Sequence, residues 1–220
     1  MGLLEAIVVV YLRQLYYPEG FTFPLKIMVF KELSVEYLRE LSTIVMLIAV
    51  AFSVGKNFYE RLSYFLLCFG LWDIFYYIWL KVILDWPPSL FTWDILFLIP
   101  VVWVSPVLAP VICAVTMILI ALCIFHKNQK ASHISYGVSN WFLLISGALI
   151  ILITFLWDYS FLIIQGGFLP RFMTLHTDIE FHDVISAHVP LTFKWLLFAF
   201  GEILILLSLL RFCFRKTMSP

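Results

Sequence analysis

Four polar residues share one face of a long apolar run, and their types could support chemistry. Asp73, Tyr77, Lys81 and Asp85 recur at every fourth position, starting inside the run Leu62–Leu84. Residues four apart are neighbours on one face of an α-helix. Ionisable groups within a membrane helix are costly and mark either a function or a paired structural contact. Two interpretations follow: an Asp73–Lys81 relay through Tyr77 that fixes helix packing, or a cation or proton site at which Asp73 titrates.

A further acid lies in the last apolar run. Glu202 stands about halfway along Leu191–Phe212, directly after Gly201. If Glu202 faces Asp73, the two like charges favour a shared proton. If it faces Lys81 instead, the two side chains form an ion pair. The spacing alone leaves both arrangements open.

Tryptophan–aspartate pairs recur along the chain, and they place Asp94 and Asp158 beside Trp93 and Trp157. One interpretation is that the tryptophans anchor in the membrane interface and the aspartates cap helix starts. The other is an outward-facing acidic vestibule, shared with Asp85, that collects cations.

Three histidines, His176, His182 and His188, fall in one polar segment that also contains several acidic residues. Histidine and carboxylate together can bind zinc, iron or copper. Their spacing of six residues does not place them on one helical face, and no H-E-x-x-H motif is present. A solvated loop is therefore expected, with a metal site as the alternative, and no pattern identifies a cofactor.

The composition is that of a membrane protein. Of the 220 residues, 63% are hydrophobic and 13% are charged, whereas soluble domains carry about 25% charged residues. A bilayer core needs about 20 helical residues per span. The sequence predicts a single all-α membrane domain, a helical transmembrane bundle with five spans near residues 41–58, 62–84, 106–125, 138–157 and 191–212, with 158–190 as an outer loop.

Two short apolar segments are ambiguous. Gly2–Leu15, within the N-terminal segment 1–40, contains Glu5 and Arg13 and is expected to lie in the interface, or to form a sixth span. Ile95–Ser105 is too short to cross, and Pro100 interrupts it. A proline-broken half-helix before the third span is predicted there, with Asp94 as its N-cap.

Basic residues predict the orientation. The loops after spans one, three and five carry seven lysines and arginines, and the opposite loops carry three. Cytoplasmic loops are enriched in these residues, so the C-terminus is expected in the cytoplasm. The four cysteines form no C-x-x-C pair and are expected to be packing residues rather than disulfide partners or zinc ligands.

Residues 39–110 contain the runs Trp72-Asp73-Ile74-Phe75-Tyr76-Tyr77, Leu96-Phe97-Leu98-Ile99-Pro100 and Pro106-Val107 with Ala109-Pro110. Through these runs the chain resembles a family of uncharacterised bacterial polytopic membrane proteins. The resemblance implies location in a bacterial cytoplasmic membrane and implies no substrate.

No nucleotide-binding or serine-hydrolase motif occurs. The balanced charge predicts no nucleic-acid partner. The leading expectation is a non-catalytic subunit or scaffold of a membrane assembly, in contact with the lipid bilayer and with partner membrane proteins. The alternative is a small cation- or proton-coupled carrier that uses Asp73, Tyr77, Lys81 and Glu202. A weaker alternative is an outward-facing metal-dependent enzyme.

Overall fold

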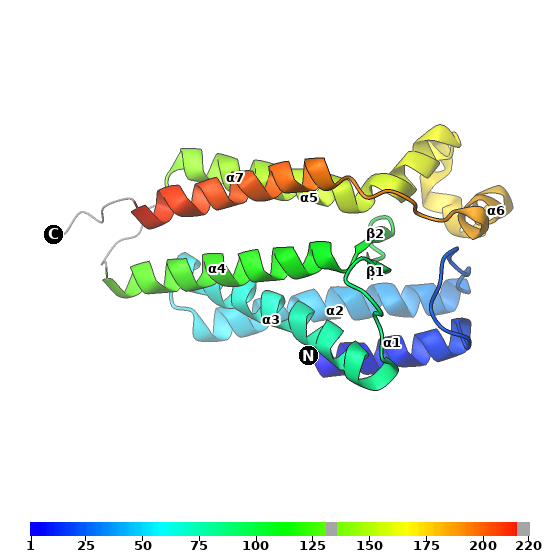
Figure 1. The fold of residues 1–220 in the computed structure, drawn as a ribbon, viewed down its shortest axis with the longest axis horizontal. Helices are drawn as coiled ribbons and strands as arrows, with labels where there is room; N and C mark the ends of the chain where they lie inside the picture. The colour runs from blue at the N-terminus through cyan, green and yellow to red at the C-terminus, as the bar shows by residue number, and fades with distance from the viewer. Residues whose placement is uncertain (131–135, 215–220) are drawn as a thin grey trace.

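The protein is a helical bundle with one small β-hairpin (Figure 1). The computed structural model describes residues 1–130 and 136–214, apart from the side chains of Gln129, Lys130, Met173 and His176. Its elements in chain order are α1 (Gly2–Tyr16), α2 (Phe30–Val54), α3 (Phe58–Leu84), β1 (Trp93–Phe97), β2 (Trp103–Pro106), α4 (Leu108–Lys130), α5 (Val138–Gln165), the 3₁₀ helix η1 (Leu169–Thr177), α6 (Ile179–Ala187) and α7 (Trp195–Phe214). The predicted all-α class is confirmed.

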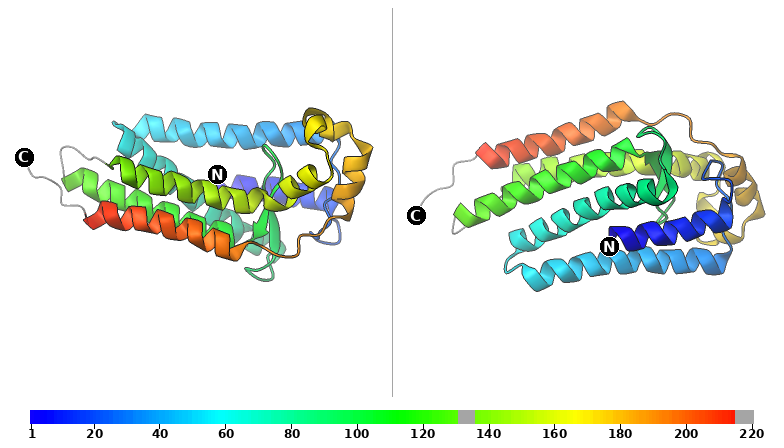
Figure 2. Two further views of the ribbon diagram at one scale, coloured as in Figure 1. Left: turned by 90° about the horizontal axis from the view of Figure 1, so that it is seen from above. Right: turned by 60° about the horizontal axis from the view of Figure 1, so that its bottom comes forward.

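Among the described residues, five helices are long and apolar enough to cross a membrane: α2, α3, α4, α5 and α7. This is the pattern of a polytopic membrane protein. Large apolar side chains stay exposed on their outer faces, as on Val82 and Leu196, where lipid can cover them. The first helix, α1, has 15 residues and packs lengthwise along α3 (Figure 2).

The helices form two layers (Figures 1 and 2). Helices α5 and α7 pair in one layer, and α1, α2, α3 and α4 form the other. Small residues allow the closest approaches, because a side chain there would meet backbone. A Cβ at Gly147 of α5 would lie 2.6 Å from the carbonyl oxygen of Gly201 in α7. A Cβ at Gly70 of α3 would lie 2.6 Å from the carbonyl oxygen of Ala114 in α4.

The predicted half-helix before the third long span is wrong. The segment forms an antiparallel hairpin in which Asp94 pairs with Ser105 and Ile95 with Val104. Its aromatic and β-branched residues favour strands, and Pro100 lies between the strands, where it removes no ladder hydrogen bond. The hairpin lies between the two layers, with η1 and α6 beyond it (Figure 1), and Asp94 is a strand residue rather than a helix cap.

The prediction that the cysteines only pack is also wrong for two of them. Cys123 near the end of α4 and Cys213 near the end of α7 form a disulfide, with Cα atoms 6.6 Å apart. Cys68 and Cys113 are free. The pairing could not be predicted because the partners are 90 residues apart in sequence, and only the packing of the two helices brings them together.

Candidate functional site

A cavity of about 930 Å³ lies between the two layers. Its wall combines α1, α2, α3, α4, α5, α7 and the hairpin, so it draws on nearly the whole chain. Most lining side chains are apolar or aromatic, including Phe69, Trp72, Phe97, Trp103 and Phe155. Six carboxylates also line it: Glu5, Glu36, Glu40, Asp73, Asp94 and Glu202. Ligand pockets are typically apolar with a few placed polar groups, which is the composition found here.

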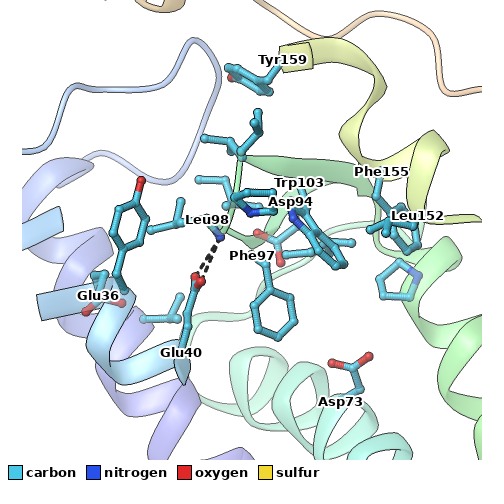
Figure 3. A pocket seen from close by; sticks show the side chains of 18 of the residues that line it. Glu36, Glu40, Asp73, Asp94, Phe97, Leu98, Trp103, Leu152, Phe155 and Tyr159 are labelled. Atoms are coloured by element: carbon cyan, nitrogen blue, oxygen red, sulfur yellow. Dashed lines mark hydrogen bonds between the residues drawn. The ribbon is translucent and has the colours of Figure 1, made fainter. Parts of the chain in front are cut away.

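Asp73 points from α3 into the space beneath the hairpin (Figure 3). Among the described residues no group forms a hydrogen bond or ion pair with its carboxylate. The charged groups that act on it are Glu5 and Asp94, which are both acidic. A carboxylate that faces a largely apolar cavity without a partner is costly when it is charged. A proton or a bound cation would lower that cost.

Lys81, one of the partners considered for Asp73, bonds to Asp85 instead. Its Nζ is 2.7 Å from Asp85 Oδ1 at the exposed end of α3, and the Asp85 side chain is 91% exposed. The stripe thus divides into two parts. Asp73 and Tyr77 face the cavity, whereas Lys81 and Asp85 form a surface ion pair. An internal Asp73–Lys81 relay is not formed.

Glu202 of α7 faces the same cavity and accepts hydrogen bonds only from neutral groups. The Thr116 hydroxyl donates to it at 3.0 Å, and the Cys113 thiol donates at 3.5 Å. No cation pairs with Glu202 in the part of the chain that the structure describes. Asp73 and Cys113 are close enough to interact electrostatically. Glu202 and Asp73 both line the cavity and form no bond with each other among the described residues, so the proton that the two acids would share stays a prediction.

A cluster around Arg39 joins α1 to α2. The Arg39 guanidinium binds Glu5 of α1, lies 2.6 Å from Glu36 and lies 3.9 Å from Glu40. Both carboxylate oxygens of Glu40 also accept the backbone N–H of Leu98, at 2.9 and 3.1 Å (Figure 3). One cation is thus shared by three acids, and Glu40 anchors the hairpin to α2.

Asp94 is held by a second arginine. Arg13 Nη2 of α1 lies 2.9 Å from Asp94 Oδ1, and its guanidinium stacks 3.7 Å from the ring centre of Trp86. Asp94 is 1% exposed. Burial raises the pKa of Asp94 to about 6, while Arg13, the Ile95 N–H and the Tyr77 hydroxyl act to lower it. Burial has the larger effect, so the pKa of Asp94 stays above its ordinary value in spite of the ion pair with Arg13.

The other predicted acidic residue, Asp158, is half-buried on α5. It lies near His188 and Lys194, two groups whose charges act on it. Asp85 is exposed and Asp94 is buried in the hairpin. The three aspartates therefore occupy different environments, and the structure does not bring them together as one exposed acidic patch.

The histidines are also separated by the fold. His182 of α6 lines the cavity, and the His188 ring lies 5.5 Å from the Tyr159 ring. The side chain of His176 lies outside the described part. Within residues 1–130 and 136–214, no three His, Cys, Asp or Glu side chains are grouped closely enough to hold a metal ion. The metal-site alternative gains no geometric support.

Glu36, Arg39 and Glu40 were not predicted from the sequence as cavity residues, and Glu5 and Arg13 entered only the membrane placement of Gly2–Leu15. A signal was present for α2. Glu32, Glu36, Arg39 and Glu40 recur at steps of three and four, the spacing of one helical face. No such signal could reveal Arg13, because its partner Asp94 lies 81 residues away.

Comparisons of the chain with protein-family models, with curated proteins and with solved structures found no match. The resemblance of residues 39–110 to a bacterial family stays a prediction. Function must therefore be argued from the cavity and its charges.

Proposed function

We propose that the protein is a small membrane carrier that binds an organic cation in its central cavity and exchanges it for protons. The single observation that supports this proposal is Asp73. It is a carboxylate on a membrane-spanning helix that faces a cavity of about 930 Å³ and has no partner among the described residues. A scaffold needs neither the cavity nor the unpaired acid.

The charge balance of the wall favours a cation over an anion. The lining contains six carboxylates and the basic side chains of Arg13, Arg39 and Lys26. It is therefore acidic when all of these groups are ionised. Both arginines already bind carboxylates. Asp73 and Glu202 have no cationic partner in the described chain. Aromatic faces such as Trp72 and Trp103 can add cation–π attraction for an organic cation.

Proton exchange follows from the same geometry. A carboxylate in an apolar cavity is neutralised either by a proton or by a bound cation, because the isolated charge is too costly. Cation and proton therefore compete for Asp73 and Glu202. Release of the cation lets a proton bind, and protonation on one side of the membrane promotes release there. This competition is the elementary step of a proton-coupled exchanger.

The experiment measures uptake of radiolabelled tetrapropylammonium into proteoliposomes that are acidic inside. Asp73→Asn should lower uptake and binding about thirtyfold or more, as expected when one partner of a buried charge pair is removed. Because Asp73 has no partner among the described residues, the variant should keep its thermal stability. Asp85→Asn, which removes an equal charge from the exposed end of the same helix, should transport normally.

Equal uptake by Asp73→Asn and the wild type would rule out the carrier proposal. The expectation of a membrane-assembly subunit then becomes the better one. That expectation predicts purification in mild detergent with fixed partners, whereas a lone monodisperse chain counts against it.

A further inference from the structure

The cavity has two chemically distinct parts. Its carboxylates lie on α1, the first half of α2, the second half of α3, β1 and, at Glu202, the first half of α7. From Asp73 toward the start of α3 the lining changes. There the wall is made by Leu62 and Leu66 of α3, Met117 and Ile120 of α4, and Ile145 and Ala148 of α5. These six side chains offer no hydrogen-bonding group. We call this part the apolar groove.

The apolar groove is long compared with an amine or a metal ion. At about 1.5 Å of rise per residue, the path along α3 from Asp73 to Leu62 measures roughly 16 Å. A small hydrated cation would find no polar contact along the apolar groove. An extended alkyl chain fills it with contacts that match its chemistry.

Resting on the carrier function proposed above, we propose that the substrate is an amphiphilic cation: an alkylammonium whose head lies between Asp73 and Glu202 and whose tail occupies the apolar groove. Charge complementarity fixes the head, since these two acids have no cationic partner in the described chain. The groove fixes the direction of the tail, away from the hairpin and toward the start of α3.

Other amphiphiles fit less well. An alkyl sulfate or fatty acid would place an anion among six carboxylates, and like charges in a low-dielectric site repel strongly. A neutral alcohol would leave Asp73 unpaired. Lipid tails are as apolar as the groove, so moving the tail out of the bilayer gains little free energy. The tail therefore affects which cations bind mainly through its fit to the groove. A side chain that blocks the groove should weaken the binding of long-chain cations.

Ala148 is suited to that test because it lines the groove and is exposed, so a larger side chain enters open space. Ala148→Phe should obstruct the tail, and tetramethylammonium binding reports whether the new ring also reaches the head site, because the adjacent Gly147 packs on Gly201 beside Glu202. Leu149→Phe is the matched control, because Leu149 is 53% exposed and is not part of the cavity wall. The protein is placed in lipid nanodiscs, and binding is corrected for empty nanodiscs. The probes are dodecyltrimethylammonium, tetramethylammonium and dodecyl sulfate.

The expected result is that Ala148→Phe weakens dodecyltrimethylammonium binding about tenfold or more, the usual cost of forcing extra bulk into an occupied site. Tetramethylammonium binding should stay within about twofold, a difference of under 1 kcal/mol. Leu149→Phe should match the wild type for both cations, and dodecyl sulfate should not bind specifically.

Each contrary result has a separate meaning. If Ala148→Phe binds the long-chain cation as tightly as the wild type while Asp73→Asn loses it, the tail assignment is wrong and the cation carrier stands. If dodecyl sulfate binds as tightly as the cation, the head assignment is wrong. If neither cation binds in a manner that depends on Asp73, the carrier function itself fails.

Discussion

At the scale of single residues, the carboxylates that line the cavity differ in the partners they bind. Asp94 pairs with Arg13, and Glu5, Glu36 and Glu40 share Arg39. Glu202 has two neutral donors, and Asp73 has no partner among the described groups. The paired acids connect elements: α1 to the hairpin, and α2 to the hairpin. The acids without a cation are the ones left to bind a ligand. Different carboxylates of the same cavity wall thus connect the elements and bind the ligand.

Asp94 makes a testable contribution to pH-dependent stability. Its pKa is raised from 3.8 to about 6 by burial, so folding favours the protonated form. That contribution, about 3 kcal/mol at 1.36 kcal/mol per pKa unit, is complete below pH 4 and lost as the pH rises to 6. The unfolding temperature of the wild type in nanodiscs should therefore fall between pH 4 and pH 6.

Asp94→Asn cannot titrate, so the difference between its unfolding curve and that of the wild type isolates this group. Asp85→Asn is the control, because Asp85 is exposed, and its pH profile should parallel that of the wild type. A wild-type minus Asp94→Asn difference that stays constant from pH 4 to pH 7 would contradict the assignment.

Prediction of these residues from sequence depended on local spacing. Asp73, Tyr77 and Glu202 were recognised because an ionisable or phenolic group stands out within an apolar run, and all of them border the cavity or its wall. Of the two interpretations of the stripe, the Asp73–Lys81 relay is not formed, because Lys81 is four residues from Asp85 and bonds to it at the helix end, whereas Asp73 is eight residues away. The Arg13–Asp94 pair has no local signature at all.

At the scale of elements, the long helices were predictable and the short ones were not. Twenty or more apolar residues satisfy their backbone in lipid only as a helix, so the five spans follow from length. Their starts and ends moved by several residues; α2, for example, begins at Phe30. The run Ile95–Ser105 is compatible with a buried strand or a helix fragment, because periodicity alone does not separate them. The structure forms β1 and β2 there.

Helix pairing supplies a second prediction. Gly147 and Gly201 let α5 and α7 approach so closely that a Cβ on Gly147 would meet a backbone oxygen at 2.6 Å. Gly147→Val should force the helices apart and lower stability by about 1–3 kcal/mol or more. The measurement is the thermal unfolding temperature in nanodiscs. Ala148→Val adds a similar side chain at the neighbouring exposed position and should leave that temperature unchanged; equal loss in both variants would refute the close-contact explanation.

At the scale of the whole molecule, the ends of the bundle differ in charge. The end formed by the last turn of α2, the first turn of α3 and the last turns of α4 and α7 carries Lys56, Arg61, Lys127 and Arg211. The opposite end holds the hairpin, η1 and α6 (Figure 1). The ends of α2, α4 and α7 that the sequence predicts on one side of the membrane lie at one end of the bundle (Figures 1 and 2). The basic excess predicts that this end faces the cytoplasm.

The disulfide at that same end gives this orientation a further consequence. Cys123 and Cys213 lie near the ends of α4 and α7, and disulfides persist in oxidising compartments but are rare in the cytosol. Basic loops and a stable disulfide therefore favour opposite orientations. Orientation is set during insertion by lysine and arginine, before any disulfide can form, so we expect the charges to decide it and the two thiols to be reduced in growing cells.

A pair of reporter fusions tests this directly. Green fluorescent protein joined after the last residue should fluoresce, and alkaline phosphatase at the same position should be inactive, because the first matures in the cytoplasm and the second requires an oxidising compartment. Phosphatase inserted between η1 and α6, near Asp178, should be active. The reverse pattern would place the disulfide outside and the hairpin inside. The cavity would then present its carboxylates toward the cytoplasm, and substrate would enter from that side.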